Sequence, residues 1–144
     1  AEPADVLVSS GMVGAAALSA AVAIPNFVSM QYRAKRSELQ PNIQAIRTAM
    51  LSYDASFDRY VEVSRFHPDS SPGKTQRKFT TGSAFDTLGW MPYGEVRGSY
   101  KVVVTSSRDF RVVGISDIDG DGVYASWTAT KSMNPTQITP GNVY

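Results

Sequence analysis

The chain has 144 residues, which suits about one domain. Its 14 Lys and Arg nearly balance its 13 Asp and Glu, so no global field draws it towards nucleic acid or an acidic substrate. It has no cysteine and one histidine, His67, which excludes disulfides, thiolate chemistry and a multi-histidine metal site.

The N-terminal part of the chain is apolar. No charged residue occurs from Val6 to Tyr32, about 27 residues that would measure roughly 40 Å as a helix and exceed the needs of a bilayer core. The segment is rich in Ala, Gly and Ser, which allow helices to approach closely. Gly11, Gly14 and Pro25 weaken its backbone hydrogen bonds. We therefore expect residues 1–32 to form a stem helix that bends locally and suits both lipid and other helices.

The first five residues are acidic rather than basic. Glu2 and Asp5 stand where a helix N-terminus favours negative charge, and the pattern is unlike that of a cleavable signal peptide. We expect a terminus that has already been processed. A plain single-span anchor remains an alternative interpretation of the stem.

A one-face apolar stripe follows the stem. Its members recur at steps of four and three residues: Leu39, Ile43, Ile46, Met50, Tyr53 and Phe57. This spacing predicts an amphipathic helix over 33–57 that packs on a core. Pro41 lacks a backbone donor, so we expect a mild kink between Leu39 and Pro41.

The C-terminal half has the pattern of a β-meander. Strands are predicted over 100–106, 110–116 and 123–130, with turns at 106–109 and 117–122. The fold class is therefore α+β, with a long N-terminal helix on an antiparallel sheet of three to four strands. We expect a head over 33–144, in which 58–99 is a long loop with a short helical turn around Phe85, Leu88 and Trp90. The tail, 131–144, is expected to be irregular, although Val143 and Tyr144 are able to dock.

Several blocks together resemble bacterial type IV pilins. They are Ala20-Ala21-Val22-Ala23-Ile24-Pro25-Asn26-Phe27, then Gln31, Arg33-Ala34-Lys35, Glu38, Asn42 to Ala49 and Tyr53, and later Phe85-x-x-Leu88-Gly89-Trp90-x-Pro92. The strongest similarity covers about residues 12 to 60. The first residues depart from the family pattern, which usually begins with a methylated phenylalanine and a Thr-Leu-Ile-Glu-like run.

The resemblance implies a structural filament subunit and no enzyme. Copies of the chain would polymerise through their stems, after being held in the bacterial inner membrane and handled by its assembly machinery, to form an extracellular pilus for attachment, motility or DNA uptake. The residues implied in assembly are Ala1, Glu2, Asp5, Gly11, Gly14, Pro25 and Phe27, with an acid near the terminus pairing with the α-amino group of Ala1 or of a neighbour. The alternatives are a type II secretion pseudopilin and a membrane-anchored periplasmic binding module.

An acidic turn is a candidate binding site for calcium, the one cofactor that the sequence suggests. Asp117, Asp119 and Asp121, followed by Gly122, match the first half of a calcium loop, but the twelfth position is Thr128 rather than glutamate. A Gly/Asp hairpin turn explains the same residues.

Two other groups of polar residues are interpreted without a special function. His67 is expected to be an exposed loop histidine. The cations Arg65, Lys74, Arg77 and Lys78, which alternate with Phe66 and Phe79, are more typical of a solvated face than of a nucleic-acid site.

Overall fold

The computed structural model describes residues 27–79 and 82–144. Residues 32–144 form one compact unit, and residues 27–31 belong to the unit that precedes it. The predictions for the stem before Phe27 lie outside the described residues. Within the described ranges, no helix has the combination of length and apolarity needed to cross a membrane.

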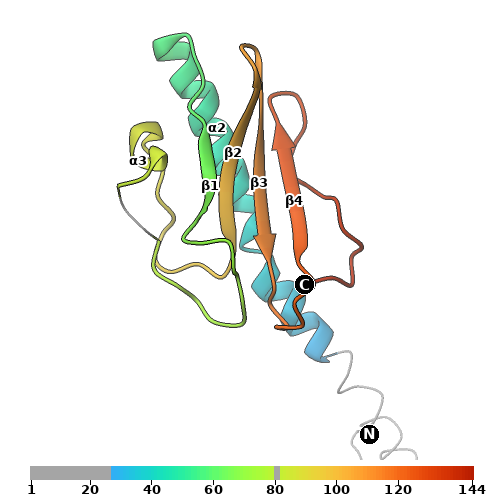
Figure 1. Ribbon diagram of the computed structural model, residues 1–144. Helices are drawn as coiled ribbons and strands as arrows, with labels where there is room; N and C mark the ends of the chain where they lie inside the picture. The colour runs from blue at the N-terminus through green and yellow to red at the C-terminus, as the bar shows by residue number, and fades with distance from the viewer. Residues whose placement is uncertain (1–26, 80–81) are drawn as a thin grey trace, which may run out of the picture. The chain divides into compact units, whose positions relative to one another are not determined.

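The head is an α+β structure, as predicted, but its sheet has five strands rather than three or four. The strands are β1 (Val63–His67), β2 (Ser99–Ser106), β3 (Asp109–Ser116), β4 (Ala125–Thr130) and β5 (Thr136–Gln137). They lie in sequence order, and each pairs antiparallel with the next. Figure 1 shows α2 (Leu39–Phe57) behind this sheet.

The two additional strands come from segments whose patterns are too short or irregular to indicate a strand. β1 pairs with β2 through Val63↔Val102 and His67↔Tyr100, with an irregular register between these pairs that breaks the alternation. β5 is two residues long and pairs with β4. Both strands depend on a partner that is distant in sequence.

The helix is interrupted, but slightly before the predicted place. Residues 27–36 are helical, Ser37 and Glu38 form a turn, and α2 begins at Leu39. Pro41 has no N–H to donate to the Ser37 carbonyl, and its ring crowds that oxygen. The effect of the proline is therefore seen four residues earlier in the chain. α2 ends at Phe57 and is followed by Asp58, which has a left-handed backbone (φ 55°) and donates its N–H to the Asp54 carbonyl at 2.7 Å.

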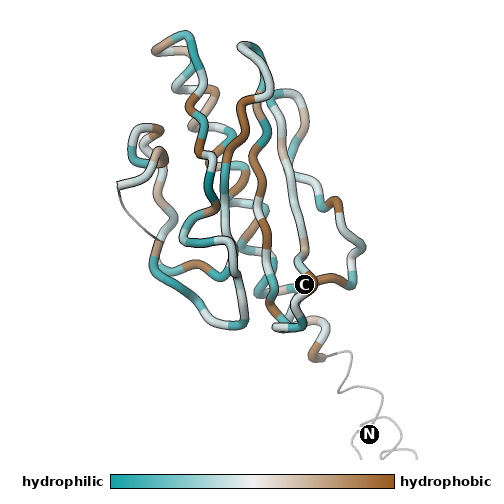
Figure 2. Tube along the Cα trace, viewed as in Figure 1, coloured by the Kyte–Doolittle hydropathy of each residue, from teal (hydrophilic) through white to brown (hydrophobic). Residues whose placement is uncertain are grey.

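The core lies between α2 and the sheet. Leu39, Ile43, Ile46 and Met50 are fully or almost fully buried, as the stripe predicts. Phe57, the last member of the stripe, is 61% exposed at the end of α2. The sheet contributes alternate buried residues of β2 and β3: Tyr100, Val102, Phe110 and Val112. Figure 2 shows hydrophobic stretches along both of these strands.

Gly114 allows α2 to approach the sheet closely. A Cβ at Gly114 would lie 2.7 Å from Cδ1 of Ile43. A larger residue there would force the helix and β3 apart. The distance between the two layers is therefore set by a glycine in the middle of a strand.

The long loop and the tail both pack on the head. The predicted short helical turn is α3 (Ala84–Leu88), whose N-terminus is capped by the Ser83 hydroxyl accepting the Phe85 N–H. Phe85 is fully buried and its ring lies 5.2 Å from that of Trp90. The carbonyl of Tyr144 accepts the N–H of Ile118 at 3.1 Å and its side chain is buried, so this residue of the tail docks on the head.

Candidate functional site

The solvent-facing side of α2 carries no charged residue. The exposed residues of this 19-residue helix are Gln40, Pro41, Ala45, Thr48, Ser52, Ala55, Ser56 and Phe57. Surface helices normally place charges opposite their apolar stripe. Here the helix has only two charged residues, Arg47 and Asp54, and both are half-buried. We call these eight exposed residues the neutral face of α2.

Small residues make the neutral face suitable for contact with another helix. Ala45, Thr48, Ser52 and Ala55 project little from the helix axis, and small side chains let two helices approach closely. The N-terminal end of the face borders a hollow of about 500 Å³ lined by Gln40, Pro41, Gln44, Asn134 and Pro135. The hollow therefore joins α2 to the segment between β4 and β5.

Arg47 takes its charge away from the neutral face. Its Nε donates to the Thr130 carbonyl at 2.7 Å, and its Nη2 donates to the Lys131 carbonyl at 2.8 Å. The guanidinium thus caps the end of β4. This leaves the adjoining exposed surface of the helix without a cation.

The sequence-predicted assembly residues lie mostly outside the described part of the chain: Ala1, Glu2, Asp5, Gly11, Gly14 and Pro25. Phe27 is described; it is helical and 60% exposed. The pairing of an N-terminal acid with an α-amino group stays a prediction.

The structure brings the three predicted calcium ligands together. Carboxylate oxygens of Asp117, Asp119 and Asp121 lie within 4.8 Å of one another. The two carboxylate oxygens of Asp117 accept the N–H groups of Asp121 and Gly122, both at 3.1 Å. Oδ1 of Asp119 is buried without a hydrogen-bond partner.

The charges of this cluster titrate unequally. Burial raises the pKa of Asp119, and the neighbouring Asp121 carboxylate raises it further. The pKa of Asp121 is lowered, first by the hydrogen bond from the Val123 N–H. Calcium binds oxygen ligands, and the carboxylate oxygens of these three aspartates are ligands of that type.

Thr128 does not complete a calcium loop. The chain returns from Asp121 into β4, where Ser116 pairs with Ala125 and Val113 pairs with Thr128. Thr128 is therefore three residues beyond the first residue of β4, Ala125, and roughly 10 Å from it along the strand. Gly120 and Gly122 have φ of 69° and 80°, as a hairpin connection between β3 and β4 requires.

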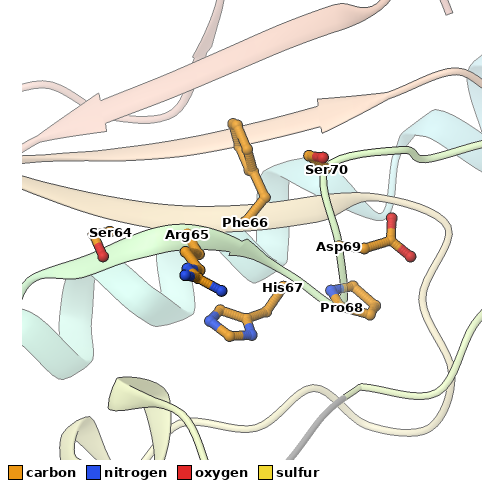
Figure 3. A pocket seen from close by; sticks show the side chains of 7 residues that line it. All are labelled: Ser64, Arg65, Phe66, His67, Pro68, Asp69 and Ser70. Carbon is orange, nitrogen blue, oxygen red and sulfur yellow. The ribbon is translucent and has the colours of Figure 1, made fainter.

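A second hollow follows the edge strand β1. It has a volume of about 570 Å³ and is lined by Ser64 to Ser70 (Figure 3). Figure 3 shows Phe66 on one side of the strand and the Arg65 and His67 side chains on the other. The interpretation of His67 as an exposed loop residue is wrong, because it ends β1 and is half-buried with its ring 5.7 Å from that of Phe85.

The basic residues of the long loop do not act as one surface. Arg77 forms an ion pair with Asp69 and donates Nη2 to the Gly98 carbonyl and the Ser99 hydroxyl. The Lys74 side chain packs against Gly120 of the acidic turn. These cations organise the loop, which weakens the case for a nucleic-acid site.

Sequence reasoning found the acidic turn but missed the neutral face. The signal was present, because α2 has only two charged residues in 19. The apolar stripe gives no sign of it, since the stripe accounts for only the buried half of the helix.

Comparison with known proteins identifies a relationship to part of a pilin. A segment of 41 residues is 49% identical to the "Type IV major pilin protein PilA" of Myxococcus xanthus (strain DK1622). It covers 28% of this chain and 19% of that protein, so the similarity spans about a fifth of the pilin's length. No protein-family model and no solved structure matches the chain. Part of the chain is therefore similar to a type IV major pilin, and the described head has an α+β fold.

Proposed function

We propose that the chain is the structural subunit of a type IV pilus filament, assembled from copies of itself through its N-terminal helix. The neutral face of α2 carries the proposal, because a helix surface without charge suits a helix-packed interior better than water. The identity of one segment to a type IV major pilin supports it. The role is structural and not catalytic.

In this proposal the stem and the neutral face are both buried in the interior of the filament. Stems of successive copies bury apolar area at roughly 25 cal/mol per Å² before entropy costs, and each contact joins two different surfaces. Such contacts repeat without closing, so the assembly grows as a filament. Before assembly, residues 1–32 hold the subunit in the inner membrane, and afterwards the heads form the outer surface of the pilus.

The experiment that tests this proposal compares cells that carry the gene with cells from which it is deleted. Material sheared from the surface is viewed by electron microscopy and identified by mass spectrometry. We expect long fibres composed of this chain, absent from the deletion strain and restored by the gene. Fibres that persist in the deletion strain, or a chain retained in the inner membrane without fibres, would contradict the proposal.

A double substitution addresses the N-terminal acids. Replacing Glu2 and Asp5 by Ala should reduce filament yield and leave the head folded, because the α-amino group of Ala1 or of a neighbour then lacks the acid that would pair with it in the stem. Undiminished filaments from this variant would exclude the pairing.

A type II secretion pseudopilin is the second candidate, and the acidic turn favours it. We propose that Asp117, Asp119 and Asp121 hold one Ca²⁺, with the partnerless Oδ1 of Asp119 as one ligand atom. Calcium at 100 times its Kd would stabilise the full chain in detergent by about 2.7 kcal/mol. The stabilisation should appear as a rise in melting temperature, which Asp119→Asn should remove. Mg²⁺ in place of Ca²⁺ is the matched control. An unchanged melting temperature in millimolar Ca²⁺ would leave only the hairpin interpretation.

A further inference from the structure

Two charged side chains at the interruption of the helix bind two different parts of the head. Arg36 precedes the turn at residues 37–38, and Glu38 is its second residue. Nη1 of Arg36 donates to the carbonyls of Gly141 at 3.0 Å and Val143 at 2.6 Å, and the guanidinium carbon lies 5.2 Å from the centre of the Tyr144 ring. Arg36 therefore binds the tail.

Glu38 binds the residues that lead into strand β2 and begin it. Its carboxylate accepts the N–H of Arg97 at 2.7 Å and the N–H of Gly98 at 2.8 Å. The buried hydroxyl of Tyr100 also donates to it at 2.8 Å, and burial and the Glu38 charge raise the pKa of that hydroxyl, which keeps its proton. Three donors from residues 97–100 thus converge on one carboxylate.

The helix itself does little to fix its own bend. Pro41 removes the hydrogen bond to the Ser37 carbonyl, and the next bond, from the Asn42 N–H to the Glu38 carbonyl, is long at 3.4 Å. A helix with a missing bond and a stretched one is easily bent at that point. The charge-assisted bonds of Arg36 and Glu38 are shorter and reach groups outside the helix.

We propose that Arg36 and Glu38 form a clamp that sets the angle between helical residues 32–36 and α2. The head, through its tail and its residues 97–100, then decides the direction in which the chain leaves it. The consequence for assembly rests on the proposed function, because a filament needs every stem to leave its head in the same direction. Both side chains are positioning residues in this sense.

A distance measurement across the interruption tests the clamp. The chain has no cysteine, so Lys35→Cys and Ser52→Cys, both at exposed positions, allow spin labels to be placed without other changes. Pulsed electron paramagnetic resonance on the full chain in detergent gives the distribution of distances between them. We expect a narrow distribution that broadens in E38Q and in R36Q, and broadens most in the double variant.

The matched control is E62Q. Glu62 also accepts a backbone N–H, from Val104 at 3.0 Å, but it lies beyond the other end of α2. The E62Q substitution should therefore leave the distance distribution narrow. Tyr100→Phe removes one of the three donors to Glu38 and should broaden it slightly, which keeps the test open if E38Q unfolds. Thermal unfolding by circular dichroism identifies any variant that has lost its fold.

Two outcomes would overturn the clamp. Distributions in R36Q and Y100F as narrow as in the parent would show that the helix fixes its own bend, and equal broadening in E62Q would show a general loosening. Filament yield is scored separately. Broadened distances with normal filaments would refute the role in assembly, whereas absence of filaments from the parent chain would refute the proposed function and leave the clamp intact.

Discussion

The two faces of the 19-residue helix α2 differ in what explains their composition. The buried face holds Leu39, Ile43, Ile46 and Met50 against the sheet and is explained by the head alone. The neutral face carries no charge, and the described head gives no reason for this. Apolar residues are buried because their transfer out of water is favourable, whereas a depletion of charged residues is typical of the centre of a protein–protein interface. The comparison separates what folds this chain from what we propose assembles it.

The largest effect is expected on the buried face. Ile46→Ala removes a fully buried side chain next to the sheet and should lower the free energy of unfolding by about 2–5 kcal/mol. Urea denaturation of the full chain in detergent measures it. Thr48→Ala, two residues along on the neutral face, is the control and should stay within about 0.5 kcal/mol. Equal losses at both positions would erase the distinction between the faces.

The next effect concerns the spacing between helix and sheet. Gly114→Ala places a methyl group against Ile43 and should destabilise the head by about 1–3 kcal/mol. Ile43→Val removes the Cδ1 atom in conflict, so the double variant should lose less than the sum of the two single losses. Additive losses in this double-mutant cycle would mean that the glycine is needed for another reason.

A smaller effect is expected at the border of the two faces. Arg47→Gln removes the charged donors from the carbonyls of Thr130 and Lys131 and should cost about 1 kcal/mol, because water reaches these partly exposed groups. The midpoint of urea unfolding measures it. Arg111→Gln, at an exposed position of β3, provides the control. A control that is as destabilised as the variant would point to net charge instead of these bonds.

The smallest change in stability should accompany the largest change in assembly. Ala45→Glu places a charge on the neutral face and should change the unfolding free energy by less than about 0.5 kcal/mol, since the position is exposed and glutamate favours helices. Filaments should be lost, because the charge would be buried unpaired in the interior. Electron microscopy of sheared material measures this, with Ser107→Glu in the exposed β2–β3 turn as the control. Normal filaments from Ala45→Glu would show that the neutral face is not an interface.

The sequence predicted the elements that depend on neighbouring residues. The steps of four and three identified the buried side of α2, and runs of β-branched residues identified β2, β3 and β4. The acidic turn was placed correctly because its glycines and aspartates are local signals of a positive φ and a tight connection.

The tertiary structure alone decided the features in which distant residues meet. β1 and β5 exist because β2 and β4 offer them partners, which no pattern within five or two residues indicates. Glu38 lies next to residues 97–100 because the start of α2 packs against the residues that lead into β2, where Leu39 lies against Gly98. A single glutamate in a helical sequence gives no sign of this contact. Local sequence determines periodicity, turns and caps through short-range sterics and hydrogen bonds. The packing of the layers alone decides which charged side chains form hydrogen bonds within the head. It also decides which surface has no charged side chain.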